Sequence, residues 1–117
     1  MHGRRVRSRV VDAPVIPQLD PRTVQAALAS GAVLVDVREA EELEEAAIPG
    51  ATWIPLSELN ERWREIPADR DVVVMCGSGR RSQAVAEALA NAGFQRVSNL
   101  GGGIIAWANA GLPVQPR

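Results

Sequence analysis

The chain of 117 residues contains one cysteine, one histidine and no lysine. A single cysteine cannot form an internal disulfide, so we expect a reducing, cytoplasmic location. The one histidine is His2, close to the N-terminus. A Cys-His dyad, a Ser-His-Asp triad and a His/Cys zinc site are therefore effectively excluded. The sequence predicts neither a metal site nor a cofactor.

Long apolar runs and a strong excess of one charge are also missing. The formal net charge is −1, and no run of about 18 apolar residues is present that could span a membrane. We therefore expect neither a nucleic-acid partner nor membrane contact. Four arginines lie within the first nine residues, but no apolar segment follows them, so a secretory signal is not expected. Residues 1–17 are interpreted as a flexible basic tail ahead of one domain, residues 18–117.

Short apolar runs alternate with helical patterns along the rest of the chain. Asp20 and Pro21 are typical of a helix start and Gly31 of a helix end, while Ser57 is predicted to cap a later helix. The predicted strands lie around residues 32–37, 51–54, 71–75 and 96–99, and the predicted helices at 21–30, 40–47, 58–65, 83–91 and 104–110. This alternation predicts an α/β fold with three layers, a central parallel β-sheet of about five strands flanked by helices.

One of these predicted helices is strongly acidic. Five glutamates lie between Glu39 and Glu45, together with a single leucine, Leu43. Acidic residues on most faces of a short helix are typical of a surface exposed to solvent. We therefore interpret this helix as solvent-facing, with Leu43 turned inward.

The only cysteine, Cys76, lies between the predicted strand at 71–75 and the helix that follows. Open α/β sheets place their ligands at this carboxyl end of the strands. Gly77 and Gly79 allow the backbone to turn so that several N–H groups point inward, and a helix N-terminus favours an anion. Arg80 and Arg81 add positive charge. These effects lower the pKa of Cys76 and favour a thiolate nucleophile over an inert buried thiol.

Other loops of similar composition fit less well. A dinucleotide-binding loop needs a third glycine where Ser82 stands, and a phosphate-binding Walker loop needs a lysine, which the chain lacks. A Cys-based phosphatase loop would also place its arginine at residue 82. Here the arginine is Arg81, which makes the loop one residue tighter and suits a ligand smaller than a phosphoryl group.

The loop sequence Cys76-Gly-Ser-Gly-Arg-Arg-Ser82 resembles the active loop of single-domain rhodanese-like sulfurtransferases. Further motifs match the same family in order and spacing, from about Leu19 to Val114. They are Asp36-Val-Arg-Glu39, Ile48-Pro-Gly-Ala51, Leu100-Gly-Gly-Gly-Ile-Ile-Ala-Trp107 and Gly111-Leu-Pro-Val114. The chain departs from the family at Ala46-Ala47, where Gly-His is usual, which makes this part of the site less polar.

The resemblance implies that Cys76 takes a sulfur atom from a donor such as thiosulfate, becomes a persulfide, and passes the sulfur to cyanide or a cellular thiol. It also implies that Arg81 recognises the anionic donor. The residues expected to hold the donor and the persulfide are Gly77, Ser78, Gly79, Arg80, Arg81 and Ser82. The expected partners are small sulfur donors, thiol acceptors and, in an alternative hypothesis, a sulfur-accepting protein served by a carrier or interaction module.

Asp36 and Arg38 follow the strand next to that of Cys76 and are expected to face the same crevice. Two roles fit them. They can contact the substrate, or they can form a buried charge pair that fixes the platform beneath the loop. The second interpretation is favoured.

Overall fold

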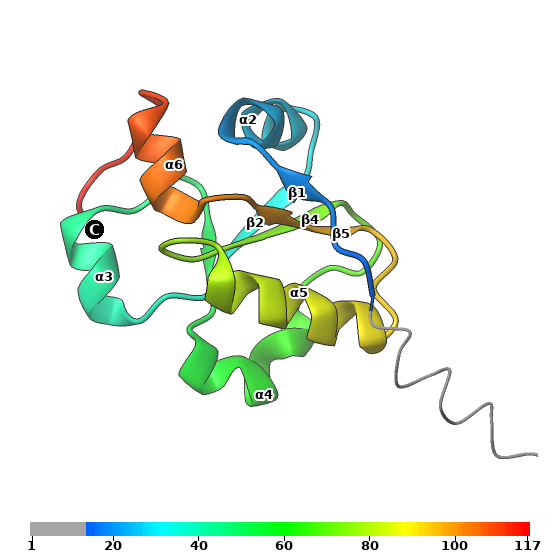
Figure 1. Cartoon of the computed structure of the whole chain (residues 1–117). Helices are drawn as coiled ribbons and strands as arrows, with labels where there is room; N and C mark the ends of the chain where they lie inside the picture. Colours follow the sequence, from blue (N-terminus) through cyan, green and yellow to red (C-terminus); the bar gives the residue numbers. More distant parts are fainter. Residues whose placement is uncertain (1–13) are drawn as a thin grey trace, which may run out of the picture.

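The computed structural model describes residues 14–117, so most of the predicted tail, residues 1–17, lies outside the described part (Figure 1). The strands are β1 (Gln18–Leu19), β2 (Val33–Asp36), β3 (Thr52–Trp53), β4 (Val72–Met75) and β5 (Val97–Leu100). The helices are α2 (Pro21–Ala29), α3 (Ala40–Glu45), α4 (Leu59–Arg62), α5 (Arg80–Asn91) and α6 (Gly103–Asn109), with 3-10 turns η1 (Leu56–Glu58) and η2 (Trp63–Glu65). Within residues 14–117, no helix has the length and apolar content needed to cross a membrane.

All five strands are parallel and lie in the order β1-β5-β4-β2-β3. Helices α4 and α5 cover one face of this sheet, and α2 and α6 cover the other (Figure 1). The predicted three-layer α/β fold is confirmed. Strand β1 was not predicted, because a two-residue strand has no period from which it can be recognised.

The middle strand, β4, is buried on both faces. Val72 and Val74 belong to the core under α5, whereas Val73 and Met75 belong to the core under α2 and α6. This alternation follows from the two-residue period of a strand, and each such side chain contributes about 1.5–3 kcal/mol when fully buried. This burial matters for function because β4 fixes the next residue, Cys76, at the middle of the carboxyl edge of the sheet.

The ends of several helices follow local signals. The predicted cap at Asp20 is confirmed, since its Oδ1 accepts the N–H of Thr23 at 2.8 Å. Leu43 turns inward on α3 and is buried, as predicted. Ahead of β1, Ile16 is also buried in the core under α5.

The predicted continuous helix at 58–65 is wrong, because this stretch is divided into the end of η1, a single α-helical turn in α4, and η2. The predicted cap at Ser57 is also wrong. Its hydroxyl donates instead to the Glu39 carboxylate at 3.0 Å, and the backbone N–H of Ser57 points to the same carboxylate at 3.4 Å. This carboxylate comes from a distant part of the chain and takes the hydroxyl that would otherwise cap the helix.

Candidate active site

Cys76 is the first residue after β4, and the loop that follows folds around its sulfur. Sγ accepts the backbone N–H of Gly79 at 3.1 Å and of Ser82 at 3.4 Å, and the Ser82 hydroxyl lies 3.3 Å away. Gly79 has φ of +97°, a left-handed conformation that allows the chain to turn inward before α5. The side chain of Cys76 is buried. The sequence-predicted cradle of N–H groups is therefore present around a buried sulfur.

This cradle changes the acidity of the thiol. Burial is the largest single influence and raises the pKa of Cys76, because a charged sulfur loses its contact with water. The hydrogen bonds from the Ser82 hydroxyl and from the N–H groups of Ser82, Gly79 and Ser78 act in the opposite direction. Together they outweigh burial, so the pKa of Cys76 lies below its usual value. The loop thus favours a thiolate, the nucleophilic form of cysteine.

The hydroxyl of Ser82 has two acceptors and one proton. Oδ1 of Asn99 lies 2.6 Å from Oγ, whereas Sγ of Cys76 lies 3.3 Å away. Asn99 on β5 cannot turn its amide, because Nδ2 already donates to the carbonyl of Gly79 at 3.0 Å. The shorter distance assigns the proton to Asn99 while the sulfur is a neutral thiol. An ionised sulfur competes better for it, because hydrogen bonds to charged acceptors are stronger.

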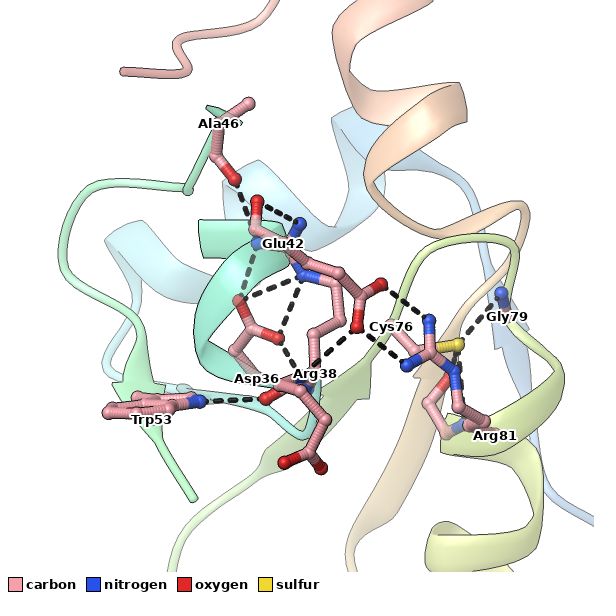
Figure 2. Close-up of polar contacts among 10 residues, drawn as sticks. Asp36, Arg38, Glu42, Ala46, Trp53, Cys76, Gly79 and Arg81 are labelled. Carbon is pink, nitrogen blue, oxygen red and sulfur yellow. Dashed lines mark hydrogen bonds and ion pairs between the residues drawn. The ribbon is translucent and has the colours of Figure 1, made fainter. Parts of the chain in front are cut away.

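Arg81 lies at the first turn of α5 and reaches across to α3. Its two terminal nitrogens donate to the two carboxylate oxygens of Glu42, each at 2.8 Å, and Figure 2 shows this pair beside Cys76. The hydrogen bonds from Arg81 are the main reason that the pKa of Glu42 falls to about 2. The hydrogen bonds to Glu42 in turn raise the pKa of Arg81, and the negative charges of Glu42 and of Cys76 act in the same direction. The arginine expected to recognise an anionic donor therefore already has a carboxylate partner.

Arg80 and Ser78, the other polar members of the loop, are exposed on its outer side. Gly77 lies beneath the Arg81 guanidinium, since a Cβ atom at this position would be 3.2 Å from one of its terminal nitrogens. The loop residues predicted from the sequence thus divide into an inner set around the sulfur and an outer set at the surface. The inner set is Gly79 and Ser82, together with the backbone N–H of Ser78.

Asp36 and Arg38 form an ion pair of 2.8 Å at the carboxyl end of β2, with side chains that are 1% and 4% exposed. The Arg38 guanidinium also donates to the carbonyl of Ala46 at 2.9 Å and weakly to that of Glu42 at 3.4 Å (Figure 2). Trp53 donates its indole N–H to the Arg38 carbonyl at 2.8 Å. These contacts favour the platform interpretation over substrate contact, because they tie α3 to the sheet.

The sequence analysis missed three residues that shape the site. Glu42 was assigned to a solvent-facing helix, and Asn99 was assigned only to a strand. Gly103, at the start of α6, has φ of +61°, and a Cβ there would collide with the carbonyls of Cys76 and Gly77. The run of three glycines before α6 was the one available signal, since close backbone approach requires glycine.

Ala47 lies where the family that the sequence resembles usually has a histidine. Its backbone forms an isolated antiparallel bridge with Gln115, with N–O distances of 2.7 and 2.9 Å. The C-terminal segment therefore pairs with the stretch that follows α3.

Most of the chain is also similar to known proteins. Residues 20–110 match the rhodanese-like domain family over most of the chain. The chain belongs to this family. A sulfurtransferase of Allochromatium vinosum is 41% identical over 102 residues, which cover 86% of this chain and 95% of that protein.

Two further proteins that the chain resembles differ in length. The crystal structure of a rhodanese-related protein from Thermoplasma volcanium has 31% identity and a TM-score of 0.78, covering 85% of this chain and 97% of that one. A putative sulfur carrier protein of Bacillus subtilis is 40% identical over 74 residues, which cover 63% of this chain but only 40% of that protein. The same kind of domain thus occurs alone and as part of longer proteins.

Proposed function

We propose that this rhodanese-like chain is a sulfurtransferase that carries sulfane sulfur as a persulfide on Cys76. The observation that supports this most directly is the set of donors around Sγ. The N–H groups of Gly79 and Ser82 and the hydroxyl of Ser82 converge on one sulfur atom. Such donors stabilise a thiolate before the reaction and the negative charge of a persulfide after it.

In the first half-reaction, the Cys76 thiolate attacks the outer sulfur of a donor such as thiosulfate. A bond forms between Sγ and that sulfur while the donor's own S–S bond breaks, and sulfite leaves with the bonding electrons. In the second half-reaction, cyanide or a thiolate attacks the outer sulfur of the persulfide. Cys76 then leaves as a thiolate, so the cycle closes without an external oxidant or reductant.

A second function is a sulfur carrier or interaction module that passes sulfur to a protein partner with little turnover of small molecules. Two observations favour it. One relative is named a putative sulfur carrier protein. In addition, Ile105 is 58% exposed on α6, and its backbone N–H donates to the carbonyl of Gly77 at 3.2 Å. An apolar side chain beside the loop suits contact with a protein.

The test is a steady-state assay of thiocyanate formation from thiosulfate and cyanide. A persulfide cycle predicts ping-pong kinetics, with parallel lines in double-reciprocal plots at several cyanide concentrations. Cys76→Ser is expected to lower kcat by at least about 10³-fold, while circular dichroism and the melting temperature stay close to those of the wild type. Intersecting lines, or activity that survives the substitution, would exclude this mechanism.

A further inference from the structure

Glu42 forms an ion pair with Arg81 of the active-site loop and belongs to a different element, α3. Building on the proposed function, we propose that Glu42 is a specificity-determining residue. It cancels the charge of Arg81, so that the site prefers sulfur donors with a singly charged leaving group over thiosulfate, whose leaving group, sulfite, is a dianion. The preferred class of donor is the persulfide of a small thiol.

The first argument is the geometry of the pair. Both terminal nitrogens of Arg81 donate to Glu42, with N–O distances of 2.8 Å. A sulfonate group that bound to the same pair of N–H groups would have to displace the carboxylate, because both anions bind best to two parallel N–H groups of a guanidinium. The pKa of Glu42 is lowered to about 2, so the competing carboxylate is charged at every physiological pH.

The second argument is that Glu42 is held from both sides. Its Oε1 also accepts the backbone N–H of Glu39 at 3.0 Å, within the capping box that begins α3. The end of α3 is in turn fixed by the bond from Arg38 to the carbonyl of Ala46. A donor therefore cannot turn the carboxylate aside without also breaking the helix cap. This is the difference between Glu42 and a mobile surface glutamate.

The third argument is the charge that each donor must release. Thiosulfate transfers its outer sulfur and leaves as sulfite, with two negative charges close to Glu42. The persulfide of a neutral thiol transfers its outer sulfur to Cys76 and leaves as a thiolate with one charge, while the proton stays on the new persulfide. Two like charges a few ångströms apart repel each other even at a protein surface. The second negative charge of sulfite therefore raises the energy of the reaction with thiosulfate relative to the reaction with a persulfide.

The test compares two donors on the same protein. Single-turnover formation of the Cys76 persulfide is followed by intact-protein mass spectrometry, with thiosulfate in one series and 2-mercaptoethanol persulfide in the other. The measured quantity is the ratio of the two second-order rates. A change in the pKa of Cys76 alters both rates together and cancels in this ratio, so the ratio reports donor recognition.

Glu42→Gln is expected to raise the thiosulfate-to-persulfide ratio by about tenfold. The neutral amide keeps a hydrogen bond to Arg81 but leaves the guanidinium charge uncompensated. Glu41→Gln is the matched control, since it removes the same charge from an exposed position of the same helix. The control is expected to leave the ratio within about twofold of the wild type, because exposed charges are strongly screened.

An unchanged or lower ratio in Glu42→Gln would overturn the proposal, and so would an equal rise in Glu41→Gln. If Glu42→Gln does not fold, the double variant Glu42→Gln/Arg81→Gln provides the second test. If the two charges cancel each other, removing both should keep the ratio within about threefold of the wild type. A large loss of the rate with thiosulfate would show that they do not cancel. Failure of the proposed function looks different, because the wild type would then gain no sulfur from either donor.

Discussion

Two arginine–carboxylate pairs flank the loop of Cys76, and they differ in burial rather than in chemistry. Asp36 and Arg38 are 1% and 4% exposed, whereas Glu42 and Arg81 are 35% and 39% exposed. Both pairs have a shortest N–O distance of 2.8 Å. Glu42 connects the two pairs, because its backbone carbonyl accepts a hydrogen bond from Arg38 and its side chain binds Arg81 (Figure 2).

Because the two pairs differ in burial, we expect them to have different roles. A buried pair that is broken leaves an uncompensated charge in the interior, which makes it a fixed part of the fold. A pair near the surface is screened by water and contributes little to stability. Glu42 and Arg81 can therefore contribute to recognition of the sulfur donor with little effect on the stability of the fold. The buried pair positions α3, and the outer pair sets the charge at the mouth of the loop.

The largest effect is expected from breaking the buried pair. Arg38→Ala leaves Asp36 charged and buried, and the free energy of unfolding is expected to fall by about 3–5 kcal/mol. The measurement is urea denaturation followed by circular dichroism. Arg62→Ala is the control, because Arg62 has two glutamate partners, Glu58 and Glu65, in exposed ion pairs. Comparable losses in the two variants would remove the distinction between buried and exposed pairs.

The outer pair should affect donor use more than stability. Arg81→Ala is expected to lower the second-order rate with thiosulfate by about 30-fold, because Glu42 is then left uncompensated and repels the dianion. The loss with 2-mercaptoethanol persulfide should be several times smaller. Stopped-flow or quenched mass measurements with both donors provide the comparison. Equal losses for both donors would show that Arg81 supports the loop and does not recognise charge.

The hydrogen bonds inside the loop should have a smaller effect. Ser82→Ala removes one donor from the sulfur, so the pKa of Cys76 is expected to rise and alkylation by iodoacetamide at neutral pH to slow by about fivefold. The pH profile of alkylation gives the midpoint. If Asn99 acts on the sulfur only through the Ser82 hydroxyl, adding Asn99→Ala to Ser82→Ala should move the midpoint no further. A further shift would indicate an independent route through Gly79.

The smallest effect concerns acid stability. The pKa of Glu42 is lowered from 4.5 to about 2, so its charged form stabilises the folded state above about pH 4.5. That contribution is lost as the pH falls toward 2. Because the pair is partly exposed, Glu42→Gln should lower the free energy of unfolding at pH 7 by less than about 1 kcal/mol. The wild type and the variant should converge near pH 2, and a constant difference would contradict the linkage.

The inner part of the site was predictable because its signals are local in the sequence. Cys76, Gly79 and Ser82 lie within seven residues, between a recognisable strand and a recognisable helix. A short apolar run indicates β4, and the glycines indicate the turn that follows it. The three-layer fold was also predictable, since short connections between alternating strands and helices leave few other topologies.

The outer part was not predictable, because its partners are far apart in the sequence. Glu42 is 39 residues from Arg81, and an acidic helix gives no indication of which glutamate has a partner. Asn99 on β5 accepts a hydrogen bond from the Ser82 hydroxyl on α5, 17 residues away. The predicted cap at Ser57 failed for the same reason, because Glu39 is 18 residues distant. Side-chain pairs across elements depend on packing, which a local pattern does not contain.

The central claim is that Cys76 carries sulfur, and intact-protein mass spectrometry tests it most directly. Wild-type protein is incubated with thiosulfate or 2-mercaptoethanol persulfide, separated from the donor, and then treated with cyanide. We predict a gain of one sulfur atom, mapped to Cys76 by peptide analysis, and its complete removal by cyanide with release of thiocyanate. No gain from either donor, or a gain that persists in Cys76→Ser, would contradict the account.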